Sequence, residues 1–180
     1  ELGMGFCTSG LALSGVALPF CATFTVFSDY MKPALRLAAL QGLHEVFVYT
    51  HDSVFVGEDG PTHQPIEHLA MLRSIPGMTV IRPAESHEVA HAWAAALQAD
   101  GPVCLVLTRQ TVPNLPAEMV ERIELGKGAY VLSDDENFEV ILLATGSEVA
   151  VALGTAGELR RQGRKVRVVS MPSWELFEAQ

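Results

Sequence analysis

The chain has few cysteines, few aromatic residues and few charged residues, and these shortages exclude several classes of protein. Aromatic residues make up 7% and charged residues 18% of the 180 residues, whereas 49% are hydrophobic, which indicates a folded globular chain. Cys7, Cys21 and Cys104 lie far apart without a CxxC or Cys/His spacing, which argues against a disulfide scaffold and a zinc motif. We expect three buried, reduced cysteines in a cytoplasmic protein.

Long apolar runs and an excess of positive charge are also missing. No apolar run reaches the roughly 18 residues that span a bilayer. The formal net charge is −9, so neither a nucleic acid nor an anionic membrane surface is expected as the main partner. The sequence lacks an initiator Met and a signal-peptide pattern, and it starts directly inside a helical pattern. We therefore expect a fragment of a longer polypeptide.

Short buried strands alternate with helices in the first part of the chain. Strands are expected at 18–24, 46–50, 78–81 and 103–107, and helices at 2–14, 28–40, 66–75 and 86–99. Ala34, Leu37 and Leu40 are expected to form the inward face of the second helix, and Ser86 to cap the fourth. This order predicts an α/β fold: a parallel sheet with helices on both faces and a site at the carboxyl ends of its strands.

The sequence changes character after residue 112, where prolines, glycines and an acidic run interrupt the pattern. We expect a first domain over 1–117 and a linker over 118–137 that includes an edge strand near 128–132. A strand at 139–144, a helix at 148–162 and a strand at 165–170 then form one βαβ unit. Because these strands have no obvious sheet to join, we expect 138–180 to be the start of a truncated second α/β domain.

The segment from His51 to Pro65 is the most polar stretch that follows a predicted buried strand. It contains two histidines, three acidic residues and two glycines. A metal site is disfavoured because His51 and His63 show no recognisable ligand spacing. Proton transfer and recognition of a polyhydroxylated substrate fit this composition better. A plain loop whose side chains satisfy its own backbone is the alternative.

Three aromatic residues and one arginine are further candidates. Phe24, Phe27 and Tyr30 recur at a spacing of three and would form a wall for a flat ring, although spacing alone favours ordinary core packing. Arg109 follows a predicted strand, where a phosphate clamp and a surface salt bridge are equally favoured. No role is assigned to the histidines that lack an acidic or basic constellation around them in the sequence: His44, His68, His87 and His91.

Several motifs together resemble the transketolase family, most closely its bacterial members. They are Glu1-Leu-Gly-Met4, Thr23-Phe-Thr-Val-Phe-Ser-Asp-Tyr30, Thr50-His-Asp-Ser53, Gly57-Glu-Asp-Gly-Pro-Thr-His-Gln-Pro65, Ile81-Arg-Pro83 and Thr108-Arg-Gln110. The resemblance covers the whole chain and implies the thiamine-diphosphate-binding fold: a pyrimidine domain followed by the start of the carboxy-terminal domain. The loop ending at Pro65 is its most specific part, because related thiamine enzymes have different loops there.

The resemblance implies transfer of a two-carbon ketol unit from a ketose phosphate, such as xylulose 5-phosphate, to an aldose phosphate, such as ribose 5-phosphate. Thiamine diphosphate would carry the chemistry, as in the pentose phosphate pathway or the Calvin cycle. Glu1 resembles the acid that hydrogen-bonds a ring nitrogen of the aminopyrimidine, which is expected in a dry pocket. Phe24, Phe27 and Tyr30 resemble the aromatic pocket around that ring, which reverses the preference for core packing.

The remaining site residues resemble a sugar-phosphate site. His63 resembles the histidine that contacts hydroxyls at the carbonyl end of the donor and assists proton transfer. Asp59 resembles the residue that reads a substrate hydroxyl. His51 and Arg109 resemble part of a clamp for the substrate phosphate.

The family's diphosphate-binding domain, which holds the divalent metal (Mg²⁺ or Ca²⁺), has no counterpart in these residues. In the family, the cofactor lies between the pyrimidine domain of one subunit and the diphosphate domain of the other subunit of a homodimer. We therefore expect no metal-binding residues in this chain, and no catalysis by the chain alone. The alternatives are another thiamine enzyme, such as 1-deoxyxylulose-5-phosphate synthase, and the non-catalytic half of a split-subunit enzyme.

Overall fold

The chain folds into two units in the computed structural model, which describes residues 1–180. The first unit comprises 1–81 and 94–111, and the second comprises 82–93 and 112–180. Helix α4 (Ser86–Leu97) contributes its first residues to the second unit and its last residues to the first. No helix in either unit combines the length and apolar character that a membrane crossing requires.

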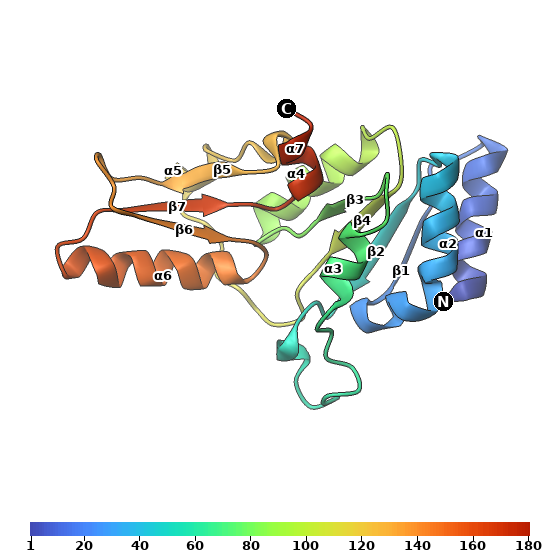
Figure 1. Ribbon diagram of the computed structural model, residues 1–180, viewed down its shortest axis with the longest axis horizontal. Helices are drawn as coiled ribbons and strands as arrows, with labels where there is room; N and C mark the ends of the chain where they lie inside the picture. The colour runs from blue at the N-terminus through green and yellow to red at the C-terminus, as the bar shows by residue number, and fades with distance from the viewer. The chain divides into compact units, whose positions relative to one another are not determined.

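The first unit is built on a four-stranded parallel sheet in the order β1-β2-β4-β3 (Figure 1). Its strands are β1 (Phe20–Phe24), β2 (Val46–Thr50), β3 (Thr79–Ile81) and β4 (Val103–Val106). Its helices are α1 (Leu2–Ser14), α2 (Ser28–Gln41) and α3 (His68–Arg73), with 3-10 turns at Thr25–Phe27 and Val54–Val56. This arrangement confirms the predicted α/β fold with a parallel sheet flanked by helices.

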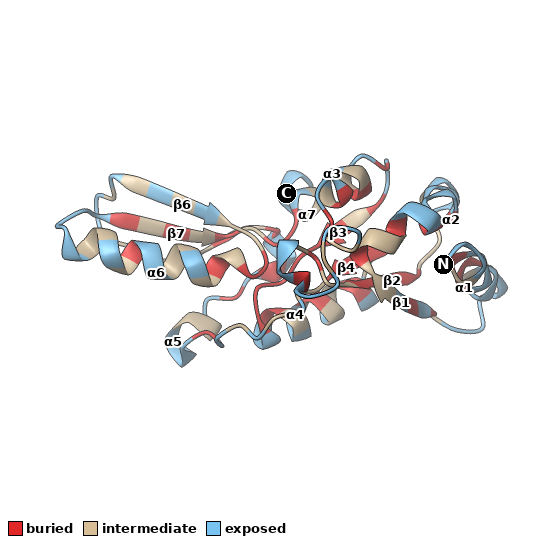
Figure 2. Cartoon of the chain, turned by 90° about the horizontal axis from the view of Figure 1, so that it is seen from below, coloured by how far each residue is buried: buried red, intermediate tan, exposed pale blue.

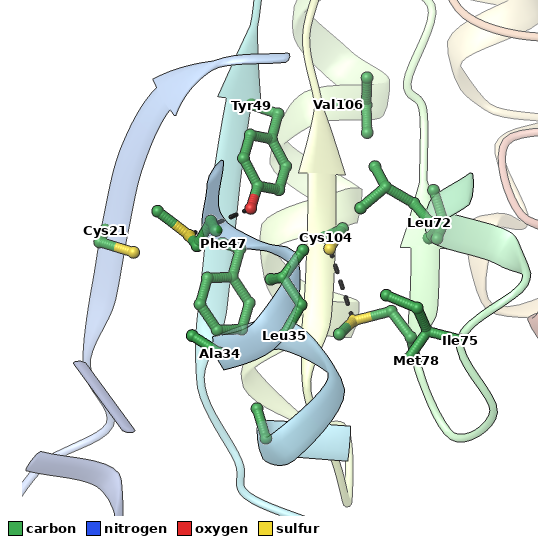
Figure 3. Packing of buried hydrophobic residues seen from close by; sticks show 13 residues of the cluster. Cys21, Ala34, Leu35, Phe47, Tyr49, Leu72, Ile75, Met78, Cys104 and Val106 are labelled. Carbon is green, nitrogen blue, oxygen red and sulfur yellow. Dashed lines mark hydrogen bonds between the residues drawn. The ribbon is translucent and has the colours of Figure 1, made fainter. Parts of the chain in front are cut away.

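The core of this unit lies between one face of the sheet and helices α2 and α3. Phe47 and Tyr49 of β2 point to this side, where they meet Ala34 and Leu35 of α2 (Figure 3). The Tyr49 hydroxyl donates a hydrogen bond to the Met31 sulfur at 3.1 Å. The alternate residues of the central strands are buried as well (Figure 2): Val46, Val48, Val103 and Leu105. Strands buried on both faces explain the near-continuous apolar runs in the sequence.

Two local expectations for the first unit are wrong. Ala34 lies on the inward face of α2 as predicted, but Leu37 and Leu40 are 36% and 71% exposed. The rest of that face is formed by Met31, Leu35 and Ala38. The buried face of α2 is thus turned by about one residue from the predicted face, because packing against the sheet decides which side of the helix is buried. Cys7 is exposed on α1, whereas Cys21 and Cys104 are buried, and all three are free thiols.

The second unit contains a three-stranded sheet in the order β5-β7-β6, with β5 antiparallel and β6 parallel to β7. Its strands are β5 (Tyr130–Ser133), β6 (Val140–Ala144) and β7 (Val166–Ser170). Its helices are α5 (Ala117–Val120), α6 (Glu148–Arg161) and α7 (Trp174–Glu178), with a 3-10 turn at Leu125–Lys127. The expectation that the βαβ strands lack a sheet is wrong, because the edge strand predicted near 128–132 pairs with β7.

A buried carboxylate joins three segments of the second unit. Glu88 of α4 is fully buried and accepts hydrogen bonds from the Ala84 amide at 2.7 Å and the Ser170 hydroxyl at 2.6 Å. The Tyr130 hydroxyl also donates to Glu88. Burial and the neighbouring carboxylate raise the pKa of Tyr130 well above its ordinary range. Because Glu88 lies in α4 and its side-chain partners lie in β5 and β7, the network fixes the start of α4 against the small sheet.

Candidate active site

The carboxyl ends of β1, β2 and β4 bring several candidate residues to one edge of the first sheet. Phe24 is the last residue of β1, and His51 directly follows β2. Arg109 lies three residues beyond the end of β4. The three strands are neighbours in the sheet and run parallel, so their ends meet at the edge where α/β proteins place their ligands.

Four rings from separate parts of the sequence form one cluster at this edge. The Phe24 ring stacks on the His51 ring, with centroids 3.7 Å apart and planes 19° from parallel. The Phe24 and Phe27 rings are nearly parallel at 5.9 Å. The edge-on His63 ring lies 5.5 Å from Phe27 and 6.4 Å from Phe24. The end of the polar loop therefore folds back onto the residues that follow β1.

Tyr30 extends this aromatic row from the first turn of α2. Its ring centroid lies 6.1 Å from that of Phe27, and its side chain is 64% exposed. Phe24 and Phe27 are half-buried. The row thus presents an open apolar surface to which a flat heterocycle can bind by stacking. This geometry favours the aromatic-wall interpretation over core packing for all three residues.

A threonine precedes each of the two histidines and holds its ring. His51 Nδ1 lies 3.0 Å from the Thr50 hydroxyl, and His63 Nδ1 lies 2.9 Å from the Thr62 hydroxyl. In both rings Nδ1 is engaged, so Nε2 is the nitrogen left to meet a ligand. Sequence reasoning missed this feature, although the repeated Thr-His pair was visible in the sequence. His51 also adopts a left-handed backbone conformation with φ of 61°, which is uncommon outside glycine.

The loop between the two histidines carries Asp59 and touches Arg109. Gly57 has φ of 91° and ψ of −133°, a conformation that side-chain-bearing residues avoid. A Cβ at Gly57 would lie 3.6 Å from the Arg109 guanidinium carbon, so the arginine packs directly against this glycine. Asp59 is exposed two residues further along. No hydrogen bond or ion pair joins Asp59 or Arg109 to the ring cluster.

Glu1 reaches the same edge of the sheet but is not buried. One of its carboxylate oxygens accepts a hydrogen bond from the Thr23 hydroxyl at 3.3 Å, which places it beside the start of the aromatic row. The side chain is exposed. The dry pocket expected around this acid is therefore not provided by the chain alone.

One histidine without an assigned role is not incidental. His68 is 4% exposed, and Asp29 and Glu67 lie next to its two ring nitrogens. The sequence concealed this constellation because Asp29 comes from α2, far from His68 along the chain. Of the others, His87 Nδ1 lies 2.8 Å from a carboxylate oxygen of the buried Glu85.

The fold of the first unit is that of a pyrimidine-binding domain. Residues 1–114 match the family described as "Transketolase, pyrimidine binding domain", and residues 128–180 match "Transketolase-like TK C-terminal domain". The chain belongs to the transketolase family.

Relatives found by sequence and by structure support the same family assignment. The chain is 53% identical over 184 residues to a transketolase of Staphylococcus aureus and 54% identical to one of Geobacillus stearothermophilus, covering 100% of this chain and 28% of each relative. It superposes on transketolase from Campylobacter jejuni with a TM-score of 0.93 at 46% identity, covering 100% of this chain and 28% of that one. A "split gene transketolase, inactive beta4 tetramer" has a TM-score of 0.82 at 31% identity and is covered to 55%.

Proposed function

We propose that this chain supplies the pyrimidine-binding half of a transketolase active site. The reaction is transfer of a two-carbon ketol unit from a ketose phosphate, such as xylulose 5-phosphate, to an aldose phosphate, such as ribose 5-phosphate. The observation that carries the proposal is the cluster of Phe24, Phe27, His51 and His63 at the strand ends. Membership of the transketolase family supports the proposal. The chain spans 28% of the length of the curated relatives that it matches.

The residues present fit thiamine diphosphate, which supplies carbanion chemistry when bound. Phe27 and the 64%-exposed Tyr30 offer an apolar surface on which the pyrimidine ring would stack. Glu1, held by Thr23 at one end of this row, would share a proton with a ring nitrogen of the pyrimidine. That role requires exclusion of water, which the exposed Glu1 would gain only when another domain covers it.

The polar residues would bind the sugar phosphate. His63, with Nδ1 held by Thr62, would present Nε2 to the donor hydroxyls and move a proton there. His51 and Arg109 would bind the phosphate, and the contact of Arg109 with Gly57 places its charge at the loop. Asp59 would accept a hydrogen bond from a substrate hydroxyl.

The rest of the site would come from a diphosphate-binding domain on the second subunit of a homodimer. That domain would also hold the divalent metal, Mg²⁺ or Ca²⁺, together with the diphosphate. The protein would act in the cytoplasm, in the pentose phosphate pathway. The free thiols of Cys7, Cys21 and Cys104 are consistent with a reducing compartment.

A chimera tests the proposal directly. The segment of the Staphylococcus aureus relative that aligns with this chain is replaced by residues 1–180. We expect ketol transfer from xylulose 5-phosphate to ribose 5-phosphate, and none from the 180-residue chain alone. A chimera that folds, dimerises and binds thiamine diphosphate without ketol transfer would contradict the proposal. Activity with pyruvate and glyceraldehyde 3-phosphate instead would favour the 1-deoxyxylulose-5-phosphate synthase alternative.

The split-subunit enzyme is the second candidate, favoured by the likeness to the split gene transketolase structure. In that case the chain would meet its diphosphate-binding domain as a separate polypeptide. Mixing the chain with a separately produced diphosphate-binding domain distinguishes the two candidates. Activity recovered on mixing supports the split arrangement, whereas activity only in the covalent chimera supports the single-chain arrangement.

A further inference from the structure

His68 is a buried histidine whose two ring nitrogens lack a hydrogen-bond partner. Its side chain is 5% exposed, and neither Nδ1 nor Nε2 makes a hydrogen bond. Buried polar atoms are nearly always satisfied, so an unsatisfied imidazole needs a ligand to explain it. Two carboxylates are next to it, from Asp29 in the first turn of α2 and from Glu67.

The spacing of these groups fits a metal ion better than a hydrogen bond. His68 Nε2 and Asp29 Oδ2 are 3.4 Å apart, which exceeds the 2.7–3.2 Å range of a good N–H···O bond. Two ligands bound at about 2.0–2.1 Å to one tetrahedral zinc ion are about 3.3 Å apart. One ligand atom from each of the three side chains lies within 4.8 Å of the others. The ion would bind Nε2 and Asp29, and the exposed Glu67 side chain, now 4.0 Å from Nδ1, would rotate toward it.

We propose that Asp29, Glu67 and His68 form a site for a divalent transition-metal ion of the zinc type. Imidazole nitrogen and carboxylate oxygen are both zinc ligands, and water would take the fourth position. The Asp29 and Glu67 side chains are 54% and 72% exposed, so they can adjust to the ion and water can reach it. The imidazole selects zinc, cobalt or nickel over magnesium and calcium. The site is therefore distinct in chemistry from a magnesium or calcium site for a diphosphate.

Metal binding would connect two segments that carry proposed active-site residues. Asp29 precedes Tyr30 of the aromatic row, and Glu67 and His68 follow the loop that contains His63. An ion held by these side chains would tie the end of that loop to the first turn of α2. We therefore expect zinc to raise the melting temperature of the chain.

Zinc titration of the 180-residue chain by calorimetry tests the site, with Cys7→Ser as background because the exposed Cys7 thiol would also bind zinc. We expect one zinc ion per chain, no binding of Mg²⁺, and a visible Co²⁺ spectrum typical of tetrahedral coordination. His68→Gln should lower zinc affinity by at least about 100-fold, and Glu67→Gln by at least about tenfold. His91→Gln is the matched control, because His91 is exposed on α4 without a nearby carboxylate partner.

These experiments measure zinc binding alone, so their outcome does not depend on whether the protein catalyses ketol transfer. Equal zinc affinity in the background chain, His68→Gln and His91→Gln would overturn the proposal and indicate adventitious binding only. Absence of zinc binding to a chain with a cooperative melting transition would overturn it as well. If His68→Gln fails to fold, the zinc affinity of Glu67→Gln tests the proposal instead, because Glu67 is exposed and its substitution should not disturb the fold. Failure of the ketol-transfer proposal would leave these results unaffected.

Discussion

At the scale of single residues, the candidate site depends on the contact between Phe24 and His51, whose ring centroids lie 3.7 Å apart at the ends of neighbouring strands. Only some of the residues around this contact were recognisable from the sequence. The many polar residues between His51 and Pro65 identified this loop as a candidate site, but the composition of the loop did not show which reaction it serves. The family resemblance supplied the roles of Phe24, Phe27 and His63, and the structure supplies their proximity. The stacking of Phe24 on His51 depends on strand register and a left-handed backbone, which no local pattern encodes.

The single residue Glu45 is predicted to make the stability of the fold depend on pH. It is fully buried, with one carboxylate oxygen bonded to the Ser9 hydroxyl at 2.8 Å, and burial raises its pKa. The unfolded chain therefore loses this proton first, near pH 4.3, so the folded state loses stability as the pH rises through the higher, folded-state pKa. We expect Glu45→Gln to remove that decline and to melt at a higher temperature than the parent chain at neutral pH.

Melting curves over a pH series provide the measurement. The gain of Glu45→Gln over the parent chain should be largest at neutral pH and shrink toward acid. A gain or loss independent of pH would show that the buried carboxyl does not titrate with folding. Glu118→Gln, at an exposed side chain on α5, is the control for a general charge effect.

Most elements were predictable because their periodicity and end signals are local. The strand at 46–50 and the helices at 2–14 and 86–99 appear within one or two residues of the expected ends. Helix faces were less predictable, as α2 shows, because the face is chosen by what it packs against. The cap of α4 is also different from that expected: the Glu85 carboxylate, not Ser86, accepts the amides of His87 and Glu88 at 3.0 Å. Helix α7 was missed, although Ser173 caps it through the Leu176 amide.

The packing of α1 against α2 gives a prediction at the element scale. A Cβ at Gly5 would lie 2.8 Å from Ala34 Cβ and 2.9 Å from Met31 Cγ, closer than such atoms can approach. Gly5→Ala therefore requires the helices to separate, and we expect a loss of about 1–3 kcal/mol in the free energy of unfolding. Gly10→Ala is the matched control on the same helix, with no atom within 4 Å, and should gain up to about 1 kcal/mol.

Urea unfolding of both glycine variants provides the measurement. The two substitutions are chemically identical and differ only in what the new methyl group meets. Equal free energies of unfolding for Gly5→Ala and Gly10→Ala would contradict the close packing of α1 on α2.

At the scale of the whole molecule, the sequence predicted the fold class but not the second sheet. The predicted edge strand and the βαβ unit were each recognised, yet their pairing through β7 was not, because antiparallel pairing across a long connection leaves no local signal. The candidate active site is also not complete within this chain. Glu1 is exposed in this chain, so under the proposed function its dry pocket would be completed by another domain.

The central claim is that the ring cluster at the strand ends forms the reacting half of a ketol-transfer site. The most direct test is the kcat/KM of the chimera for xylulose 5-phosphate and ribose 5-phosphate, with His63→Ala compared against His91→Ala. Loss of a positioned proton-transfer group should lower kcat/KM by about 10²–10⁴-fold for His63→Ala. His91→Ala should leave it unchanged. A His63→Ala chimera that keeps kcat/KM within about threefold of the parent would contradict the account.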